Sequence, residues 1–292
     1  MTRPALDDTS TADPTVRTVP PGDAKPATTW GRRLAQVFPP LITFCVFLGL
    51  WYFISYVFLD PARRFLLPPP HRVVQVGFMQ SENLIELLAA LWDTLRVSMV
   101  GLVVAIVIGM TLAILMSQAK WIERSLYPYA VVVQTIPILA LVPLIGFWFG
   151  FNFNSRVIVV VMIAIFPIIT NTLFGLLSVD RSLHDLFSLH NAGRWTRLVK
   201  LQLPNALPAI FTGFRISAGL SVIGTIVAEF FFRQGAPGIG RLLDIYRASL
   251  RSEMLISAIF WSSLLGVVVF WGFSFLDHAV TRKWLDTGRG TT

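Results

Sequence analysis

The sequence contains few charged residues and almost none of the side chains that build metal or disulfide sites. Only 14% of its 292 residues are charged, whereas soluble domains average about 25%, so a soluble globular protein is disfavoured. The single cysteine, Cys45, excludes an intramolecular disulfide framework. The four histidines have no metal-ligand spacing, and neither G-x-x-x-x-G-K-[ST] nor H-E-x-x-H occurs. The chain is therefore not expected to bind a metal, or to bind nucleotide through its own phosphate loop.

The excess of positive charge does not predict binding to nucleic acid. The net charge is +8, and 54% of the residues are hydrophobic. The basic residues lie in short segments between long apolar runs and form no continuous basic face. This pattern predicts an integral membrane protein that contacts the lipid bilayer and no nucleic acid.

Six apolar segments are predicted to cross the membrane, which gives an all-α fold. Each is long enough, because about 20 residues of helix span a hydrocarbon core of about 30 Å. Residues 1–30, rich in Pro, Thr, Ala and Asp, are predicted to be a disordered tail. Residues 31–285 then form the membrane domain and 286–292 a second short tail. The predicted spans are 36–58, 97–118, 128–148, 157–178, 209–232 and 254–277, and amphipathic surface helices are predicted at 71–90 and 241–251.

The third apolar segment is predicted to bend at Pro137, because proline removes a backbone donor and clashes with the preceding turn. A further bend at Pro143 is left open. Gln134 and Thr135 lie beside the bend, and two interpretations of them stay open. They either face a translocation path or form hydrogen bonds between helices.

Small residues recur at every fourth position in two segments, which predicts close helix packing in lipid. The two rows are Gly101, Ala105, Gly109 and Ala113, and Gly213, Ser217, Ser221 and Thr225. The fifth segment also carries Arg215 and Glu229. They are about 21 Å apart along a helix and therefore cannot pair. Arg215 is predicted to reach the membrane surface, whereas Glu229 has either a functional or a structural role. The candidate path residues are Gln134, Thr135, Pro137, Asn171, Ser221 and Glu229.

A polar, basic segment at 185–208 separates the fourth and fifth spans. A turn is predicted at 191–193, followed by an amphipathic stretch. Its apolar face is predicted to hold Trp195, Leu198, Val199 and Leu203, with Arg194, Arg197 and Lys200 elsewhere. On pattern alone this is either a module that docks on another protein or an ordinary inner loop. Lys and Arg are more frequent on the side that carries both termini, which favours cytoplasmic termini and a cytoplasmic segment.

This segment resembles the EAA loop of ABC importer permeases, whose pattern is E-A-A-x3-G-x9-I-x-L-P. Asp185 takes the acidic position, Leu186 and Phe187 replace the alanines, and Leu201, Leu203 and Pro204 complete the motif. Asn191 replaces the glycine, and asparagine is among the residues best able to adopt positive φ, so the turn is expected to survive with help from Gly193. Further motifs between about Phe65 and Asp277 resemble the nitrate/sulfonate/taurine-type permeases, among them Phe166–Thr172, Val227-Ala228-Glu229 and Gly238-Ile239-Gly240.

The resemblance implies a six-helix, type I (MetI-like) permease domain with no bond chemistry of its own. The implied partners are a second permease chain, expected to be identical, cytoplasmic ABC ATPase subunits that bind ATP and magnesium, and an extracellular or periplasmic solute-binding protein. The chain itself is expected to hold no cofactor and to lie in a bacterial inner membrane as a multi-pass protein. A small anionic or heterocyclic solute is implied. The residues implied to couple to the ATPase are Asp185, Leu186, Phe187, Asn191, Gly193, Arg194, Trp195, Arg197, Leu198, Leu201, Leu203 and Pro204.

Two other classes of protein compete with this interpretation. A secondary transporter driven by an ion gradient is expected to show inverted repeats and intramembrane ion ligands. No convincing repeat is seen, and Glu229, near the outer end of its span, is the only intramembrane acidic residue. A membrane enzyme would need His, Asp or Glu clustered at one depth, and none cluster.

Overall fold

The computed structural model describes residues 29–232, 235 and 237–287, and side chains between residues 38 and 280. Most of the predicted N-terminal tail, residues 233, 234 and 236, and the end of the C-terminal tail lie outside the described residues. All regular structure in the described ranges is helical, which confirms the all-α fold. Five helices are long and apolar enough to cross a membrane, or six if one bent pair counts as a single span.

The chain divides into two units, residues 1–51 and 52–292, each described by itself. The first unit holds most of helix α1 (Thr29–Phe53), whose side chains from Phe38 to Leu50 are almost all exposed and apolar. The π-helical turn η1 (Ile54–Phe58) follows. The second unit continues with the short elements η2 (Pro61–Arg63), α2 (Pro70–Val74) and η3 (Gln75–Met79).

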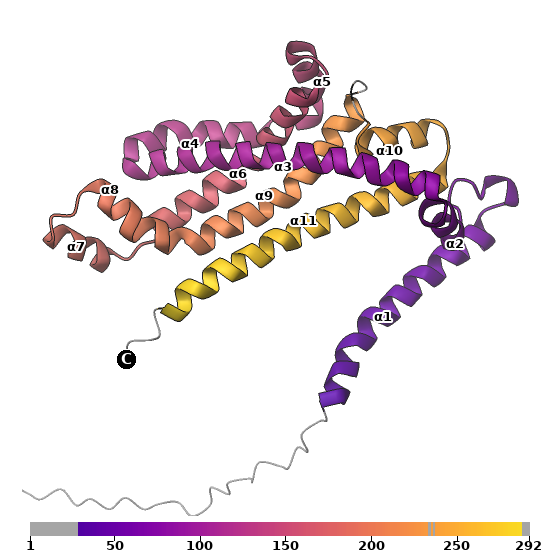
Figure 1. Ribbon diagram of the computed structural model, residues 1–292, viewed down its shortest axis with the longest axis horizontal. Helices are drawn as coiled ribbons and strands as arrows, with labels where there is room; N and C mark the ends of the chain where they lie inside the picture. The colour runs from indigo at the N-terminus through magenta and orange to yellow at the C-terminus, as the bar shows by residue number, and fades with distance from the viewer. Residues whose placement is uncertain (1–28, 233–234, 236, 288–292) are drawn as a thin grey trace, which may run out of the picture. The chain divides into compact units, whose positions relative to one another are not determined.

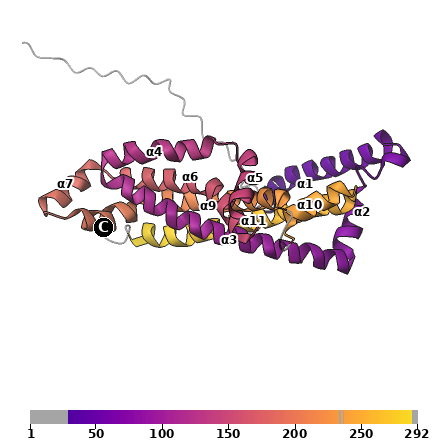
Figure 2. The same ribbon diagram turned by 90° about the horizontal axis from the view of Figure 1, so that it is seen from above.

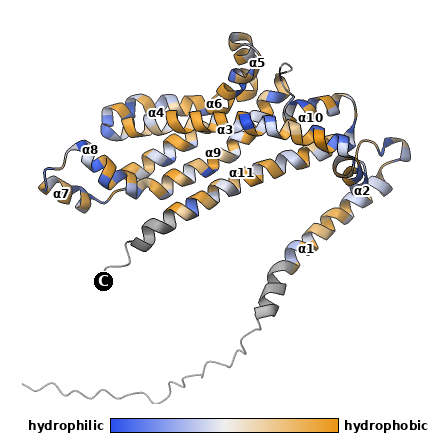
Figure 3. Ribbon diagram, viewed as in Figure 1, coloured by the Kyte–Doolittle hydropathy of each residue, from blue (hydrophilic) through white to orange (hydrophobic). Residues whose placement is uncertain are grey.

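The long helices of the second unit are α3 (Ser81–Gln118), α6 (Phe153–Leu177), α9 (Leu203–Phe231) and α11 (Ser252–Thr287). Figures 1 and 2 show α3, α6 and α9 running side by side, with α11 along α9. Apolar residues predominate along these helices (Figure 3). Helix α3 differs from the prediction, because Ser81 to Ala90 is its first part and not a separate surface helix. This stretch is rich in Leu, Ala and Glu, which favour helix, and no proline interrupts α3.

The bend in the third apolar segment is confirmed. Helices α4 (Lys120–Thr135) and α5 (Ile138–Phe149) meet at an angle of 98°. Ile136 between them is extended, with ψ of 129°, as expected for a residue before proline. Pro143 lies inside α5 without breaking it. Helix α4 also begins earlier than the predicted start at residue 128.

Both rows of small residues are buried and pack α3 and α9 against α6, as predicted. A Cβ added at Gly101 would meet the Val160 side chain at 2.5 Å, so only glycine permits this approach. On α9, the Ser217 hydroxyl donates a hydrogen bond of 2.6 Å to the Ala164 carbonyl. Gly213 lies so close to α6 that an added Cβ would be 2.9 Å from the Pro167 carbonyl oxygen. The three helices therefore form one tightly packed core.

Candidate functional site

The predicted docking segment forms two short helices joined by a tight turn. Helix α7 (Arg181–Leu189) is followed by α8 (Arg194–Arg197) and the π-helical turn η4 (Leu198–Gln202), which leads directly into α9. Figure 1 shows α7 and α8 at one end of the long helices, with α10 (Ile239–Ala248) toward the other end. The segment thus continues into the packed core through an uninterrupted helical path.

The turn between α7 and α8 depends on Asn191. Its φ is 51°, in the left-handed region, which confirms the predicted positive φ at this position. The Ala192 amide donates to the Phe187 carbonyl at 3.0 Å, and Arg197 Nε donates to the Ala192 carbonyl at 3.0 Å. Gly193 has a φ of −65°, so its own conformation does not require glycine. The substituted motif therefore keeps its turn.

The apolar residues of the segment fall into two groups, which corrects the predicted single face. Leu198 is only 2% exposed and packs with Leu176 of α6 and Ile210 of α9, and Leu201 is also buried. Trp195, in contrast, is 75% exposed. The π-helical turn inserts an extra residue per turn, so helical-wheel spacing calculated from the sequence does not hold across it. Leu198 and Leu201 anchor the segment, and Trp195 is available to a partner.

Helix α7 contributes an exposed apolar ridge, most of which the sequence analysis missed. Leu183, Leu186 and Leu189 follow one another at every third position and are all exposed, Leu189 by 80%. Residues three apart lie on one helix face. Leu183 precedes the motif, and Leu189 falls at one of its unspecified positions, so neither is among the residues that the resemblance implies. The remaining predicted residues differ in their exposure. Asp185, Asn191, Gly193 and Arg194 are exposed, whereas Phe187, Arg197, Leu203 and Pro204 are partly buried.

The six candidate path residues do not share one environment. Gln134, Thr135 and Pro137 are exposed at the α4–α5 bend. Asn171 is partly buried, and its side-chain amide donates to the Pro167 carbonyl at 2.8 Å. Ser221 and Glu229 are fully buried on α9. Their role in a path stays a prediction.

Glu229, near the end of α9, contacts the first turn of α10. It accepts a backbone hydrogen bond there for which the residues next to α10 offer no acceptor. Its Oε2 accepts the Gly240 amide at 3.1 Å and lies 2.8 Å from the Thr94 hydroxyl. The same hydroxyl oxygen accepts the Ile239 amide at 2.9 Å. The residue before α10 is Gly238, which has no side chain to cap the first amides. Glu229 of α9 and Thr94 of α3 thus cap α10 together.

The glycines around α10 allow this contact. A Cβ on Gly238 would collide with the Glu229 carboxylate, and one on Gly240 with the Ile226 carbonyl oxygen. The Arg156 guanidinium of α6 lies 4.0 Å from Glu229 Oε1 and is also buried. The motifs Val227-Ala228-Glu229 and Gly238-Ile239-Gly240, separate in the sequence, therefore form one cluster with α3 and α6.

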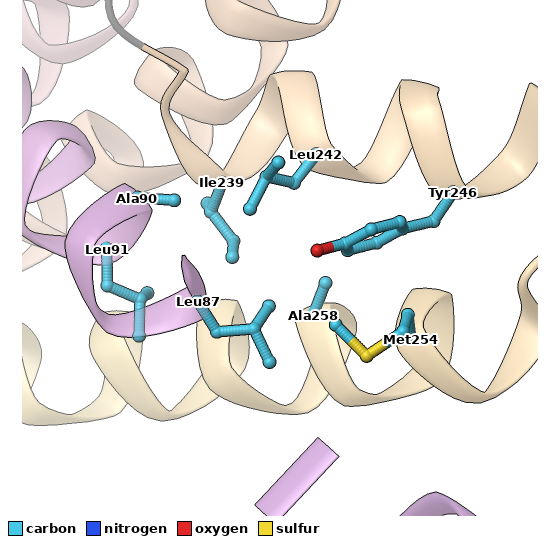
Figure 4. Packing of buried hydrophobic residues seen from close by; sticks show 8 residues of the cluster. All are labelled: Leu87, Ala90, Leu91, Ile239, Leu242, Tyr246, Met254 and Ala258. Atoms are coloured by element: carbon cyan, nitrogen blue, oxygen red, sulfur yellow. The ribbon is translucent and has the colours of Figure 1, made fainter. Parts of the chain in front are cut away.

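Apolar packing fixes the rest of α10. Figure 4 shows the buried cluster that joins α10 to α3 and α11, with Leu87, Ala90, Leu91, Ile239, Leu242, Tyr246, Met254 and Ala258. The Tyr246 hydroxyl donates to the Glu86 carboxylate at 3.0 Å. Burial and this hydrogen bond raise the pKa of Tyr246, so it stays a neutral donor. No group of three or more potential metal ligands occurs among the described residues.

Comparison with known proteins shows to which family the chain belongs. Residues 105–282 match the family model described as "Binding-protein-dependent transport system inner membrane component". The chain belongs to this family. Among its relatives, the formylaminopyrimidine transport permease protein ThiX of Halalkalibacterium halodurans is 34% identical over 240 residues, which are 82% of this chain and 93% of the relative. The nitrate import permease protein NrtB of Leptolyngbya laminosa is 27% identical over 249 residues, which are 82% and 86% of the two chains.

A solved structure agrees with the fold. A chain of the bacterial alginate ABC transporter, crystallised with its alginate pentasaccharide-bound periplasmic protein, superposes with a TM-score of 0.59. The alignment covers 86% of this chain and 96% of that chain, at 14% identity. The protein is thus an ABC importer permease of the nitrate/sulfonate type with a MetI-like fold. The comparisons give no support to an ion-driven secondary transporter.

Proposed function

We propose that the permease couples to a cytoplasmic ABC ATPase through α7 and Trp195. The observation that carries this proposal is the exposed leucine ridge of α7 on an otherwise basic, polar segment. An amphipathic helix of this kind binds by inserting apolar anchors at i, i+3 spacing into a groove. The flanking cations Arg181, Arg194 and Lys200 are all exposed and would meet acidic groups at the rim of that groove.

Movement of the ATPase subunits would reach the core directly. Leu198 packs with Leu176 of α6 and Ile210 of α9, and η4 continues into α9 without a break. A displacement of α7 would therefore shift α9, which packs against α3, α6 and α11. Coupling requires that the ATPase bind differently to two states of the permease. ATP and magnesium would be held by the ATPase, and this chain would hold no cofactor.

The complete importer would contain two permease chains, proposed to be identical, two ATPase subunits and an external solute-binding protein. Both termini and α7 would lie in the cytoplasm of a bacterial cell and α10 on the outer side of its inner membrane. The relatives named for formylaminopyrimidine and nitrate support a small heterocyclic or anionic solute. The role of the six candidate path residues in the route of the solute remains a proposal. They are Gln134, Thr135, Pro137, Asn171, Ser221 and Glu229.

Cross-linking tests the coupling proposal. Cys45 is the only native cysteine, so a Cys45→Ser background accepts a single new cysteine at Leu189. In membranes that contain the assembled importer, a bifunctional maleimide–amine reagent should join Leu189→Cys to the ATPase. Gln80→Cys, exposed at the opposite end of α3, is the matched control and should give no such product. Equal yields from the two positions, or none from Leu189→Cys, would contradict the proposal.

A further inference from the structure

A positively charged cavity of about 450 Å³ lies where the first apolar helix ends. Arg64, His71 and Arg72 line it together with Tyr56 and Phe65. None of the described residues that line it is acidic. A cavity with two guanidinium groups and no lining carboxylate attracts anions, because nothing on its wall neutralises the arginines.

Arg64 is held in place by its neighbours. Its guanidinium lies over the Tyr56 ring, 4.8 Å from the ring centroid, and one of its nitrogens donates to the Tyr56 carbonyl at 3.4 Å. Its Nε is buried and has no hydrogen-bond partner among the described residues. A guanidinium has five N–H donors, and the contact with the Tyr56 carbonyl uses one of them. Arg64 therefore keeps donors for a ligand in the cavity.

The wall that carries His71 is also ordered. The His71 ring stacks on Tyr52 at a centroid distance of 5.9 Å, and its Nδ1 lies 3.2 Å from the Tyr52 hydroxyl. Arg72 follows in the first turn of α2 and is exposed. Arg64 therefore reaches the cavity from the loop between η1 and α2, and His71 and Arg72 reach it from α2.

The surroundings of the cavity place it at the boundary of the membrane. The first apolar helix and η1 end at Phe58, which is 77% exposed, and Tyr56, Phe65 and Leu66 are exposed beside it. Aromatic side chains gather where the hydrocarbon core meets the headgroups, and arginines near helix ends reach that level. An anion abundant at this depth is the phosphate of a phospholipid.

We propose that this cavity binds the phosphate of an anionic phospholipid headgroup. Phosphate oxygens accept paired hydrogen bonds from a guanidinium, so Arg64 would hold the phosphate, with Arg72 as the second cation. The surplus of positive charge selects a headgroup with net negative charge over a zwitterionic one. Nothing in this site depends on the proposed contact with the ATPase, which lies at the other end of the long helices.

Lipid binding to the purified, full-length permease tests the proposal. Native mass spectrometry in detergent would compare short-chain phosphatidylglycerol with phosphatidylcholine of the same chain length. Wild type should retain phosphatidylglycerol in preference. Arg64→Gln and Arg72→Gln should each weaken that binding about fivefold, the loss expected for one cation at a membrane surface. Because Arg72 is exposed, its replacement keeps the test valid if Arg64→Gln folds poorly.

Arg247→Gln is the matched control. Arg247 also lies over an aromatic ring, that of Phe230, but it is paired with Asp244 at 2.8 Å, so its loss should leave lipid binding unchanged. The proposal is overturned if all three variants retain lipid equally. It is also overturned if inorganic phosphate or glycerol phosphate displaces the lipid at equal concentration, since the site would then recognise free phosphate. A loss of affinity for the solute-binding protein with lipid binding intact would assign the arginines to that protein instead.

Discussion

Glu229 and Thr94 replace the cap that Gly238 cannot provide at the start of α10. Both side chains are fully buried, so the Ile239 and Gly240 amides have no access to bulk water if these acceptors are lost. A buried donor left without a partner costs about 1–3 kcal/mol. The acceptors come from α3 and α9, so the same hydrogen bonds also join three helices.

Replacement of Glu229 by alanine should therefore destabilise the permease by about 1–3 kcal/mol. Glu229→Gln keeps an amide oxygen that can accept from Gly240, and its effect should be smaller. Thr94→Ser keeps the hydroxyl, whereas Thr94→Val loses it. Thermal unfolding of the detergent-solubilised protein should rank Glu229→Ala and Thr94→Val below their conservative partners. If each pair melted at the same temperature, the proposed cap would carry no stability.

The turn at Asn191 shows how far a single residue could be predicted. The φ required by the motif and the tolerance of asparagine for positive φ were enough to predict its conformation. The role of Glu229 could not be predicted in the same way. Its partner Thr94 is 135 residues away in the sequence, and a single sequence does not show which amides remain uncapped after folding.

At the scale of elements, the leucines of α7 are exposed, whereas those of η4 are buried and anchor the segment. Leu198 packs in the core, and its truncation to alanine is expected to cost about 2–5 kcal/mol. A break at Leu198 would therefore damage folding as well as coupling. Leu189 is exposed on α7 and can be changed without opening a cavity.

Leu189→Asp should abolish coupled transport while the protein remains in the membrane. The added charge would have to be desolvated in the groove of the ATPase, which is costly without a cationic partner. Solute uptake and solute-stimulated ATP hydrolysis in reconstituted vesicles would be measured together with the amount of permease. Ser188→Asp introduces the same charge at an exposed position of α7 that is not part of the leucine ridge, and is the matched control. Equal loss of coupling at both sites, or normal uptake by Leu189→Asp, would argue against a specific docking ridge.

The existence of the long helices could be predicted from the length of the apolar segments. The bend at Pro137 could be predicted from the effect of proline on a helix. Helix ends were less predictable. Helix α3 extends back to Ser81 and the α8–α9 helix to Arg194 because each polar end continues a helix that the membrane segment already nucleates. The packing rows could be predicted, since spacing of four residues directly specifies one face of a helix.

At the scale of the whole molecule, the positions of α7 and α10 at opposite ends of the long helices (Figure 1) make the membrane orientation testable. The bias of Lys and Arg predicts that both termini, and hence α7, lie in the cytoplasm. A helical unit with α7 inside must expose the end of α10 outside. Leu189 and Ser249 are both exposed, so each can report on one side of the membrane.

In the Cys45→Ser background, Ser249→Cys should react with a membrane-impermeant maleimide added to intact spheroplasts, and Leu189→Cys should react only in inside-out vesicles. The difference follows from the bilayer, because a charged reagent does not cross the hydrocarbon core at a measurable rate. Detergent-solubilised protein, in which both positions should label, controls for local reactivity. The reverse pattern would place α7 outside, where no ATP-driven subunit could reach it, and the coupling proposal would fail together with the orientation.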